Sequence, residues 1–458
     1  MHFIKSLFPQ SLKNLYHLAQ AIAANVIFGF PSRKLRVIGV TGTDGKTTTV
    51  QMIAEILQET GNPIKSGDHV ARKVAMASTI NFRINGVEEK NLSHFTTESA
   101  FALQRFIKKA VKAGCEYLVL ETSSHSLDQH RVWGVAFDVA VITNVTREHL
   151  DYHKTMEKYR EAKGKLFAMV AKQTKVISHK SSVIIVNADM DDPKEFLNFN
   201  VDKKIAYSTK ETRLPLTDDR LQYVYAKDVE LGINFSKFKV QNSLAGQAQF
   251  TLNLPGIFNV ENALAAVCVA LGEGIDLEQA SYALSKIKGV PGRMEAIENE
   301  IGVNILVDFA LTPNALERLY KLLSEIKKPT AKIIAVFGSC GDRDKGKRPI
   351  MGEIVAKQAD IVILTNDEPY HEKPQTIIDE IKAGIKNKTE EENLFAIIDR
   401  REAINKALQL ANPDDIVCVT GMGNFESMVV GDKKIPWNDR QVIEEELKVL
   451  QDTRNKKQ

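Results

Sequence analysis

Cysteine is scarce in this 458-residue chain, and the four that occur lie far apart, with no C-x-x-C pair (Cys115, Cys268, Cys340 and Cys418). This excludes a disulfide framework and a zinc knuckle, and it favours a reducing cytoplasm. An excess of one charge is lacking too, because 61 Lys and Arg against 58 Asp and Glu leave a formal net charge of +3. This balance argues against a dominant nucleic-acid-binding surface, although it leaves room for a local basic stripe, and no nucleic-acid partner is expected.

A long hydrophobic run is also missing. The most apolar stretch near the start, residues 15–30, is interrupted by His17, Gln20 and Asn25. It is too short and too polar for a membrane span, so we expect a packed helix and a cytoplasmic protein. A peripheral contact of this helix with a membrane surface is the weaker alternative.

The composition that is present is ordinary for globular proteins, with 43% hydrophobic and 26% charged residues and length for about three domains. Short apolar runs alternate with charged, helix-periodic stretches, which predicts an α/β fold with a parallel sheet covered on both faces. Residues 203–254 alternate polar and apolar positions, so we expect added antiparallel strands there. The apolar runs are Leu35–Val40, Tyr117–Leu120, Val139–Thr143, Val183–Val186, Ile333–Phe337, Ile361–Leu364 and Ile416–Val419.

Polar clusters follow most of these runs directly, among them ETSSH, TNVTREH, GSCGDRDKGKR, TNDEPY and TGMGNFES. Open α/β sheets bind ligands at the carboxyl ends of their strands, so these clusters are expected to converge on one or two clefts. A Pro-Gly pair at residues 291–292 suggests a boundary. We therefore expect a short N-terminal helical segment (1–35), a central domain (36–290) and a C-terminal domain (291–458).

The sequence Thr41-Gly42-Thr43-Asp44-Gly45-Lys46-Thr47-Thr48 follows the first apolar run and precedes an amphipathic helix. Glycines let the backbone N–H groups face a phosphate, and the helix N-terminus adds partial positive charge. Lys46 can reach the β- and γ-phosphates, and the Thr47 hydroxyl can ligate Mg²⁺. The spacing, G-x-x-G-K-T, is shorter than the usual phosphate-loop motif. It still predicts a bound nucleoside triphosphate in a P-loop NTPase-like central domain.

With this loop, six further segments resemble the Mur ligase family and follow its order. They are ETSSHSLDQHR (121–131), TNVTREHLDYH (143–153), YREAKGKLF (159–167), GIFNVENALAA (256–266), PGRMEAI (291–297) and GSCGDRDKGKRPIMG (338–352). The nearest likeness within the family is to the tripeptide synthetases of peptidoglycan synthesis. The resemblance covers about residues 36–445 and implies a Rossmann-like C-terminal domain.

What the resemblance implies is an ADP-forming, ATP-dependent acid–amino-acid ligase. A substrate carboxylate attacks the γ-phosphate of ATP, and an amino acid's amine then attacks the resulting acyl phosphate. Such chemistry needs neutralised phosphates, fixed cations around the transferred group and a deprotonated amine close to the acyl carbon. The implied partners are small molecules: ATP, an amino acid and a muramoyl-peptide-like carboxylate. A monomer is expected.

The resemblance also assigns metal ligands. Thr47, Glu121 and His149 resemble ligands of two Mg²⁺ ions. Lys163 resembles a carbamylated lysine, whose carbamate can hold a metal; forming it requires the neutral amine. Taken without its motif, Lys163 would be one more solvated lysine. The expected catalytic residues are Lys46, His149, Lys163 and Arg293.

Contacts with nucleotide and substrate are implied in the same way. Asn259 and Asn262 are expected at the nucleotide, although capping of the helix that starts there is an alternative. Arg293 resembles a hinge arginine that closes the C-terminal domain onto ATP. The expected nucleotide contacts are Gly42, Thr43, Asp44, Gly45, Lys46, Thr47, Thr48, Asn259, Asn262, Arg293 and Asp308. The expected substrate contacts are Thr96, Thr97, Ser123, Gln129, Arg131, Asp367, Glu368, Tyr370 and Glu426.

Four departures from the family pattern stand out. About 36 residues precede the phosphate loop, where relatives have a uridine-diphosphate-binding domain, so the acceptor is expected to be held differently. Leu311 replaces a histidine. Where diaminopimelate-adding enzymes have D-N-P-R, residues 367–370 read DEPY, which favours an incoming amino acid with a cationic end, such as lysine. Glu426 lies one residue later than the acid of the family motif, which leaves its contact with the α-amine open.

Two other functions remain open at this point. One keeps the ligase chemistry and changes the acceptor, as in folylpolyglutamate synthases or cyanophycin-type ligases. The other is a nucleotide-binding regulatory protein without ligase activity. Whichever of these functions applies, five basic residues are expected to make the nucleotide-binding cleft cationic. They are Lys46, Arg131, Arg293, Arg343 and Arg348.

Overall fold

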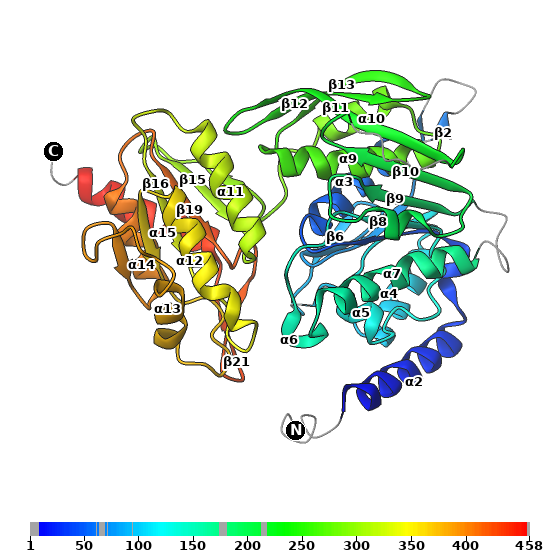
Figure 1. The fold of residues 1–458 in the computed structure, drawn as a ribbon, viewed down its shortest axis with the longest axis horizontal. Coiled ribbons are helices and arrows are strands. Elements are labelled where there is room, and N and C mark those ends of the chain that lie inside the picture. The colour runs from blue at the N-terminus through cyan, green and yellow to red at the C-terminus, as the bar shows by residue number, and fades with distance from the viewer. Residues whose placement is uncertain are drawn as a thin grey trace.

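The computed structural model describes residues 9–60, 62–63, 69–70, 72–93, 95–173, 181–211 and 218–455. Two α/β bodies lie side by side, each built around its own sheet (Figure 1). The predicted domain boundary at residues 290–292 falls between the last helix of the first body, α10 (Leu277–Ser285), and the first strand of the second, β14 (Glu295–Ile297).

The first sheet has eleven strands in the order β13-β12-β11-β10-β9-β8-β1-β7-β4-β5-β6. Its centre, from β4 to β11, is parallel, and antiparallel hairpins extend both edges. The antiparallel strands predicted within residues 203–254 are present as β11–β13. The bounds are β1 (Arg36–Thr41), β4 (Val74–Ala77), β5 (Asn81–Ile84), β6 (Val87–Lys90), β7 (Tyr117–Glu121), β8 (Val139–Ile142), β9 (Val183–Asn187), β10 (Lys203–Ser208), β11 (Leu221–Leu231), β12 (Ser236–Asn242) and β13 (Gly246–Leu252).

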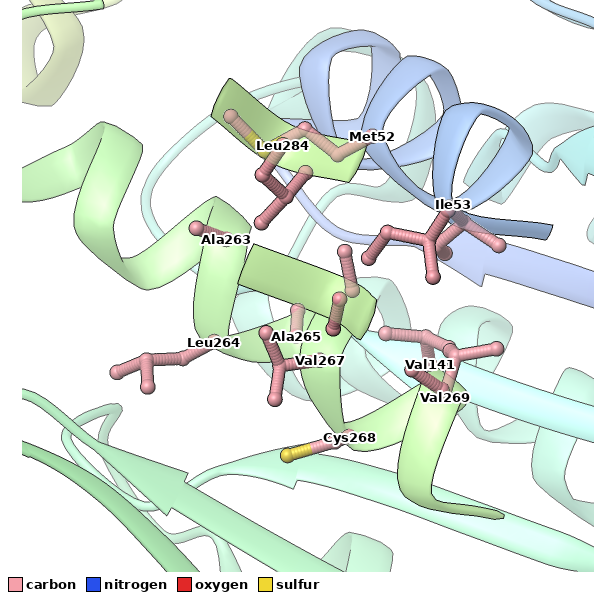
Figure 2. Packing of buried hydrophobic residues seen from close by; sticks show 14 of the residues in the cluster. Met52, Ile53, Val141, Ala263, Leu264, Ala265, Val267, Cys268, Val269 and Leu284 are labelled. Carbon is pink, nitrogen blue, oxygen red and sulfur yellow. The ribbon is translucent and has the colours of Figure 1, made fainter. Parts of the chain in front are cut away.

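Helices cover both faces of this sheet, because its central strands are apolar on both sides. One face packs against α3 (Lys46–Glu59), α9 (Ile257–Gly272) and α10. Figure 2 shows this core, where Met52 of α3 lies next to Leu284 of α10; Leu264 and Val267 of α9 belong to the same cluster. The other face packs against α4 (Ala100–Lys112) and α7 (Met156–Gln173). Short elements complete this body: η1 (Pro31–Lys34), β2 (Asn62–Pro63), β3 (His69–Val70), α5 (Ser124–Asp128), α6 (Leu150–His153) and α8 (Lys194–Leu197).

The second sheet has six strands in the order β14-β15-β19-β16-β17-β18, and all but β14 are parallel. Three helices bury residues on one face and two on the other. This confirms the predicted α/β class with a second, Rossmann-like sheet. The bounds are β15 (Asn304–Asp308), α11 (Pro313–Ile326), β16 (Ile333–Phe337), η2 (Lys345–Lys347), α12 (Arg348–Gln358), β17 (Ile361–Leu364), α13 (Pro374–Lys382), β18 (Leu394–Ala396), α14 (Arg400–Leu410), β19 (Ile416–Thr420), β20 (Ser427–Val430), β21 (Lys433–Pro436) and α15 (Asp439–Asn455).

The helix predicted near the start of the chain is α2 (Gln10–Phe28), which ends at Gly29 in the left-handed region. Ala21 and Ala24 pack against the start of α4. The predicted packing of this helix therefore holds only for the face that carries Ala21 and Ala24, because most side chains on the opposite face are exposed. Among the residues that the structure describes, no helix combines the length and apolar character needed to cross a membrane.

Candidate functional site

The phosphate loop joins β1 to α3 as a strand–turn–helix unit. Gly42 and Gly45 both have positive φ, at 152° and 81°, and α3 begins at Lys46 directly after Gly45. The side-chain oxygen of Asn144 accepts hydrogen bonds from the backbone N–H groups of Thr43 and Asp44 at 3.2 and 2.9 Å. The loop is therefore held from a neighbouring strand end in the geometry that presents a helix N-terminus to a phosphate.

Glu121 stands beside this loop because β7 is the parallel neighbour of β1, with Glu121 opposite Val40. Its buried carboxylate accepts a hydrogen bond from the Thr47 hydroxyl at 3.0 Å. Thr79 holds the same carboxylate through its backbone N–H at 2.8 Å and its hydroxyl at 2.9 Å. A carboxylate and a loop hydroxyl are thus fixed together, and both are oxygen ligands of the kind that Mg²⁺ prefers.

His149 lies beside the loop and is half-buried, whereas Lys163 lies behind the loop and is fully buried. Burial, with His125 and nearby lysines, lowers the pKa of His149 well below its usual value, so the imidazole is neutral. Burial, with Lys46, likewise lowers the pKa of Lys163. The Lys163 amine donates to the carbonyl of Gly42 at 2.6 Å. Burial thus favours the neutral amine, which is the form that can react to give a carbamate.

The second body completes a cleft of about 310 Å³ over the phosphate loop, here called the main cleft. Arg293 approaches from the domain junction, with one guanidinium N–H 3.5 Å from the Thr47 hydroxyl. Its guanidinium carbon lies 4.4 Å from the centre of the Phe309 ring. Asp308 accepts backbone hydrogen bonds from Met294 and Ala310, both at 2.7 Å. These contacts place an arginine next to the expected phosphate position.

Other contacts cross from one body to the other around the main cleft. Lys347 donates to Glu148 at 3.1 Å, and both side chains are buried. Asp44 of the phosphate loop accepts hydrogen bonds from Thr312 and Asn314, each at 3.3 Å. The two bodies are therefore held in a closed arrangement by polar contacts at the loop itself.

Three residues of the DEPY segment line the main cleft at the carboxyl end of β17. Burial raises the pKa of Asp367 to about 7, and the neighbouring Glu368 adds to the rise. Glu368 accepts hydrogen bonds from the backbone of Val429 at 3.2 Å and from the Tyr370 hydroxyl at 3.4 Å. Arg343 lies over the Tyr370 ring at 5.3 Å. One cleft therefore contains both the phosphate loop and a pair of buried carboxyl groups.

Comparison with known proteins identifies this arrangement. The sequence profile of the Mur ligase middle domain matches residues 40–270, and that of the Mur ligase glutamate ligase domain matches residues 292–423. The chain belongs to the Mur ligase family. It is 38% identical to a UDP-N-acetylmuramyl-tripeptide synthetase of Roseiflexus sp. over 92% of this chain and 80% of that protein. It is 36% identical to a UDP-N-acetylmuramoyl-L-alanyl-D-glutamate–2,6-diaminopimelate ligase of Syntrophomonas wolfei, over 94% and 82%.

Solved structures agree with this assignment. A ligase structure of the same diaminopimelate-adding type has a TM-score of 0.59 and 32% identity, and the match covers 91% of this chain and 79% of that one. A folylpolyglutamate synthase of Mycobacterium tuberculosis, solved with ADP and AMPPCP, has a TM-score of 0.66 at 16% identity, over 88% and 92%. The second likeness shows a shared fold alone. As a Mur ligase, the chain is an ATP-dependent, ADP-forming ligase.

The structure brings most of the predicted site residues of this Mur ligase to one place. Lys163 lies directly behind the main cleft, at the Gly42 carbonyl. Among the described residues, no three His, Cys, Asp or Glu side chains group as a metal site. The predicted metal ligands include only two such residues, and the others are a hydroxyl and a lysine. The predicted residues that line the cleft are Thr43, Asp44, Gly45, Lys46, Thr47, Thr48, Thr96, Glu121, His149, Asn259, Asn262, Arg293, Asp308, Asp367, Glu368 and Tyr370.

Three predicted substrate contacts have structural partners outside the main cleft. Arg131 donates to the backbone carbonyls of Thr97 and Glu98 and so supports the turn that carries Thr96. Ser123 caps α5 by accepting from the Ser126 N–H at 3.1 Å. Gln129 follows at the other end of α5.

Thr97 is buried and hydrogen-bonds the Glu121 carbonyl at 2.9 Å. It belongs to the wall of a smaller pocket of about 240 Å³, which Thr96 shares with the main cleft. Of the predicted substrate residues on this side, only Thr96 lines the main cleft, and Ser123, Gln129 and Arg131 line neither of these two pockets.

Glu426 and Arg348 do not lie where the sequence analysis placed them. Glu426 lies outside the main cleft, in a second groove between the bodies, where it pairs with Lys90 at 2.5 Å. Phe425, one position earlier, occupies the cleft wall and packs edge-on against Phe309. Arg348 does not contribute to a cationic cleft, because it is fully buried and paired with Glu372 and Glu380.

Sequence reasoning missed Asn144, Lys347 and the pair Phe309–Phe425. Asn144 lies in TNVTREH and Lys347 in GSCGDRDKGKR. Both segments were predicted to lie at a cleft, but neither residue was singled out within its segment. Their roles depend on which segments meet in space, since Asn144 contacts the phosphate loop and Lys347 contacts Glu148 across the cleft.

Proposed function

We propose that this Mur ligase joins an amino acid to the terminal carboxylate of a UDP-muramoyl-dipeptide-type acceptor during peptidoglycan synthesis. One observation carries the proposal: a single cleft is lined by the phosphate loop from one body and by Asp367 and Glu368 from the other. The relatives named as tripeptide synthetase and diaminopimelate ligase support the substrate class.

The reaction follows from the arrangement of charges. Lys46 and Arg293 flank the expected γ-phosphate position and offset the charge that develops as the acceptor carboxylate attacks phosphorus. ADP leaves and an acyl phosphate remains. The free amine of the amino acid then attacks the acyl carbon, and inorganic phosphate departs with the C–O bond electrons. Closure through Asp44, Thr312 and Asn314 shields the acyl phosphate from water.

The residues near the loop fit a site for two Mg²⁺ ions. Thr47 and Glu121 would hold one, and His149 with a carbamylated Lys163 would hold the other. The fit rests on the oxygen donors fixed around Thr47, the neutral imidazole of His149 and the buried amine of Lys163, whose pKa burial lowers. Bound there, the metal would supply charge neutralisation to the phosphates and polarise the transferred group.

The amino acid that best fits the DEPY segment has a cationic end, such as lysine. Asp367 and Glu368 are buried carboxyl groups at one end of the cleft, and one side-chain oxygen of Asp367 has no hydrogen-bond partner among the described residues. Tyr370 stands where diaminopimelate-adding relatives carry an arginine. A distal ammonium would satisfy these acids, whereas the second carboxylate of diaminopimelate would meet like charge.

The deciding experiment measures ADP release and analyses the products by mass spectrometry. ATP, UDP-N-acetylmuramoyl-L-alanyl-D-glutamate and a panel of lysine, ornithine and diaminopimelate are supplied. We expect a tripeptide product with lysine preferred over diaminopimelate. Lys46→Met should abolish product, while Lys90→Met, at an exposed pair, should change the rate less than about threefold.

Three results would contradict parts of the proposal separately. Preference for diaminopimelate refutes the amino-acid assignment alone. Product with a folate-type or other carboxylate, but none with the muramoyl acceptor, refutes the acceptor assignment. ATP binding without any amide product favours a regulatory nucleotide-binding protein over a ligase.

A further inference from the structure

Helix α2 is attached to the protein by three polar side chains, on the side where Ala21 and Ala24 are also buried. Gln10 donates to the Tyr152 hydroxyl at 3.0 Å, and Asn14 donates to Asp128 at 3.0 Å. Near the other end, Asn25 is fully buried and donates to the backbone carbonyl of Trp133 at 2.7 Å. These three anchors, spread along the helix, fix which way it is rotated.

The opposite side of α2 is exposed and apolar. After the first two residues of the helix, every exposed position carries an apolar side chain, with spacings of three and four residues that keep them on one face. At 1.5 Å per residue the helix spans about 28 Å. Val26 and Ile27 are 64% and 68% exposed. This face, the α2 stripe, consists of Leu12, Leu15, Tyr16, Ala19, Ile22, Ala23, Val26 and Ile27.

The surroundings of the α2 stripe are basic. The first 43 residues contain five Lys and Arg and no Asp or Glu. Helix α4, against which α2 packs, carries four basic residues and no acidic one. The basic residues exposed next to α2 in the chain and on α4 are Arg33, Lys34, Arg105, Lys109 and Lys112.

We propose that the α2 stripe docks this protein onto the surface of a membrane rich in anionic lipids. The helix would lie in the plane of the surface, with the stripe at the boundary of headgroups and acyl chains and the basic residues at the phosphates. The proposal does not depend on which acceptor or amino acid the ligase takes. It explains why α2 turns a large apolar face outward while small alanines and three polar side chains hold it to the protein.

A second copy of this chain fits the α2 stripe less well. A symmetric dimer through α2 would bring the basic surfaces of the two α4 helices toward each other, and like charges oppose such an interface. An anionic bilayer satisfies the apolar stripe and the basic flank together.

The test is co-sedimentation of the full chain with vesicles. Vesicles of phosphatidylglycerol mixed with phosphatidylcholine should bind the protein, binding should weaken as salt is raised, and phosphatidylcholine alone should bind at least about tenfold less. Leu15→Glu combined with Val26→Glu should reduce binding to the anionic vesicles by at least about tenfold. Leu244→Glu is the matched control, since Leu244 is 75% exposed in the turn between β12 and β13. These two strands lie at the opposite end of the first body from α2 (Figure 1). It should bind as the parent does.

Retained ADP release and an unchanged melting temperature show that a variant is folded. If the stripe variant does not fold, Lys34→Glu with Lys112→Glu decides, because it should weaken the anionic preference while leaving the stripe intact. Absence of binding to anionic vesicles at low salt overturns the proposal, and so does binding that neither variant reduces. A concentration-dependent dimer in light scattering that Leu15→Glu abolishes, without vesicle binding, assigns the stripe to a second copy instead.

Discussion

Replacing Gly45 by alanine should weaken nucleotide binding far more than the same change at a glycine of equal backbone geometry. Gly45 has φ of 81° and ends the phosphate loop at the start of α3. An alanine Cβ there would lie 3.2 Å from Cγ of Asn262 and nearer still to its side-chain oxygen. Asn262 is buried and accepts a hydrogen bond from Thr49 at 3.3 Å, so it has little freedom to move away.

Gly246 provides the matched control. Its φ is also 81°, and a Cβ added there meets no atom within 4 Å. Left-handed backbone costs an L-residue about 1–2 kcal/mol at either position. Overpacking against Asn262 adds about 1–3 kcal/mol at Gly45 alone. The sum, about 2–5 kcal/mol, corresponds to roughly 30-fold to more than 10³-fold weaker binding if the loop must keep its shape to hold phosphate.

Calorimetric titration with Mg²⁺ and ADP measures this difference directly. We expect Gly45→Ala to raise the Kd within that range and Gly246→Ala to leave it unchanged, with at most a small fall in melting temperature. A Kd for Gly45→Ala within threefold of the parent value would refute the reasoning. So would equal weakening by both variants, because the clash with Asn262 would then contribute nothing.

Three further predictions concern buried ionisable groups. Lys163→Met should lower the rate of ADP release at least about tenfold, and added bicarbonate should raise the rate of CO₂-depleted parent protein but not of this variant. The pKa of Asp367 is raised from 3.8 to about 7, so its stabilising contribution is present below about pH 4 and is lost as pH rises through about 7. Asp367→Asn should therefore melt above the parent, by a margin that widens between about pH 5 and about pH 8 in thermal unfolding. Lys347→Met strands the buried Glu148 carboxylate at a cost of about 3–5 kcal/mol. Because this pair spans the cleft, kcat/KM should fall by about 10²- to 10³-fold, with partial recovery in Lys347→Met combined with Glu148→Gln; no recovery would contradict the pairing.

The phosphate loop was predictable because its geometry is local. A strand, two glycines with positive φ and a helix N-terminus lie within fifteen residues, so no distant contact is needed to recognise them. The position of Glu121 followed from a slightly longer argument, since parallel neighbours place their carboxyl ends at one edge.

Glu426 shows where such reasoning stops. In the loop after β19, the acid lies one residue later than in the family motif. Phe425 lines the main cleft, and Glu426 lies in the second groove beside Lys90. Sequence spacing indicated that the register was altered. It could not indicate which side chain faces the cleft, because that depends on how the loop packs between the two bodies.

The same limit applies to α2. Its apolar residues predicted a packed helix, yet the helix is held by Gln10, Asn14 and Asn25 and turns its apolar stripe outward. Periodicity identifies two faces of a helix but does not say which face meets the protein. The face of α2 that meets the protein is determined by the hydrogen-bond acceptors Tyr152, Asp128 and the Trp133 carbonyl.

The amino-acid sequence by itself determined the α/β class, the phosphate loop and the family, because these depend on short-range pattern and on motifs in a fixed order. The tertiary structure decided which predicted residues share a cleft, which arginines are free for ligands and which face of α2 is exposed. Arg348 illustrates the reason: a guanidinium in a motif can bind a ligand or fill a buried ion pair, and Glu372 and Glu380 settle the matter from distant positions in the chain. Such outcomes depend on long-range partners, which a local pattern does not contain.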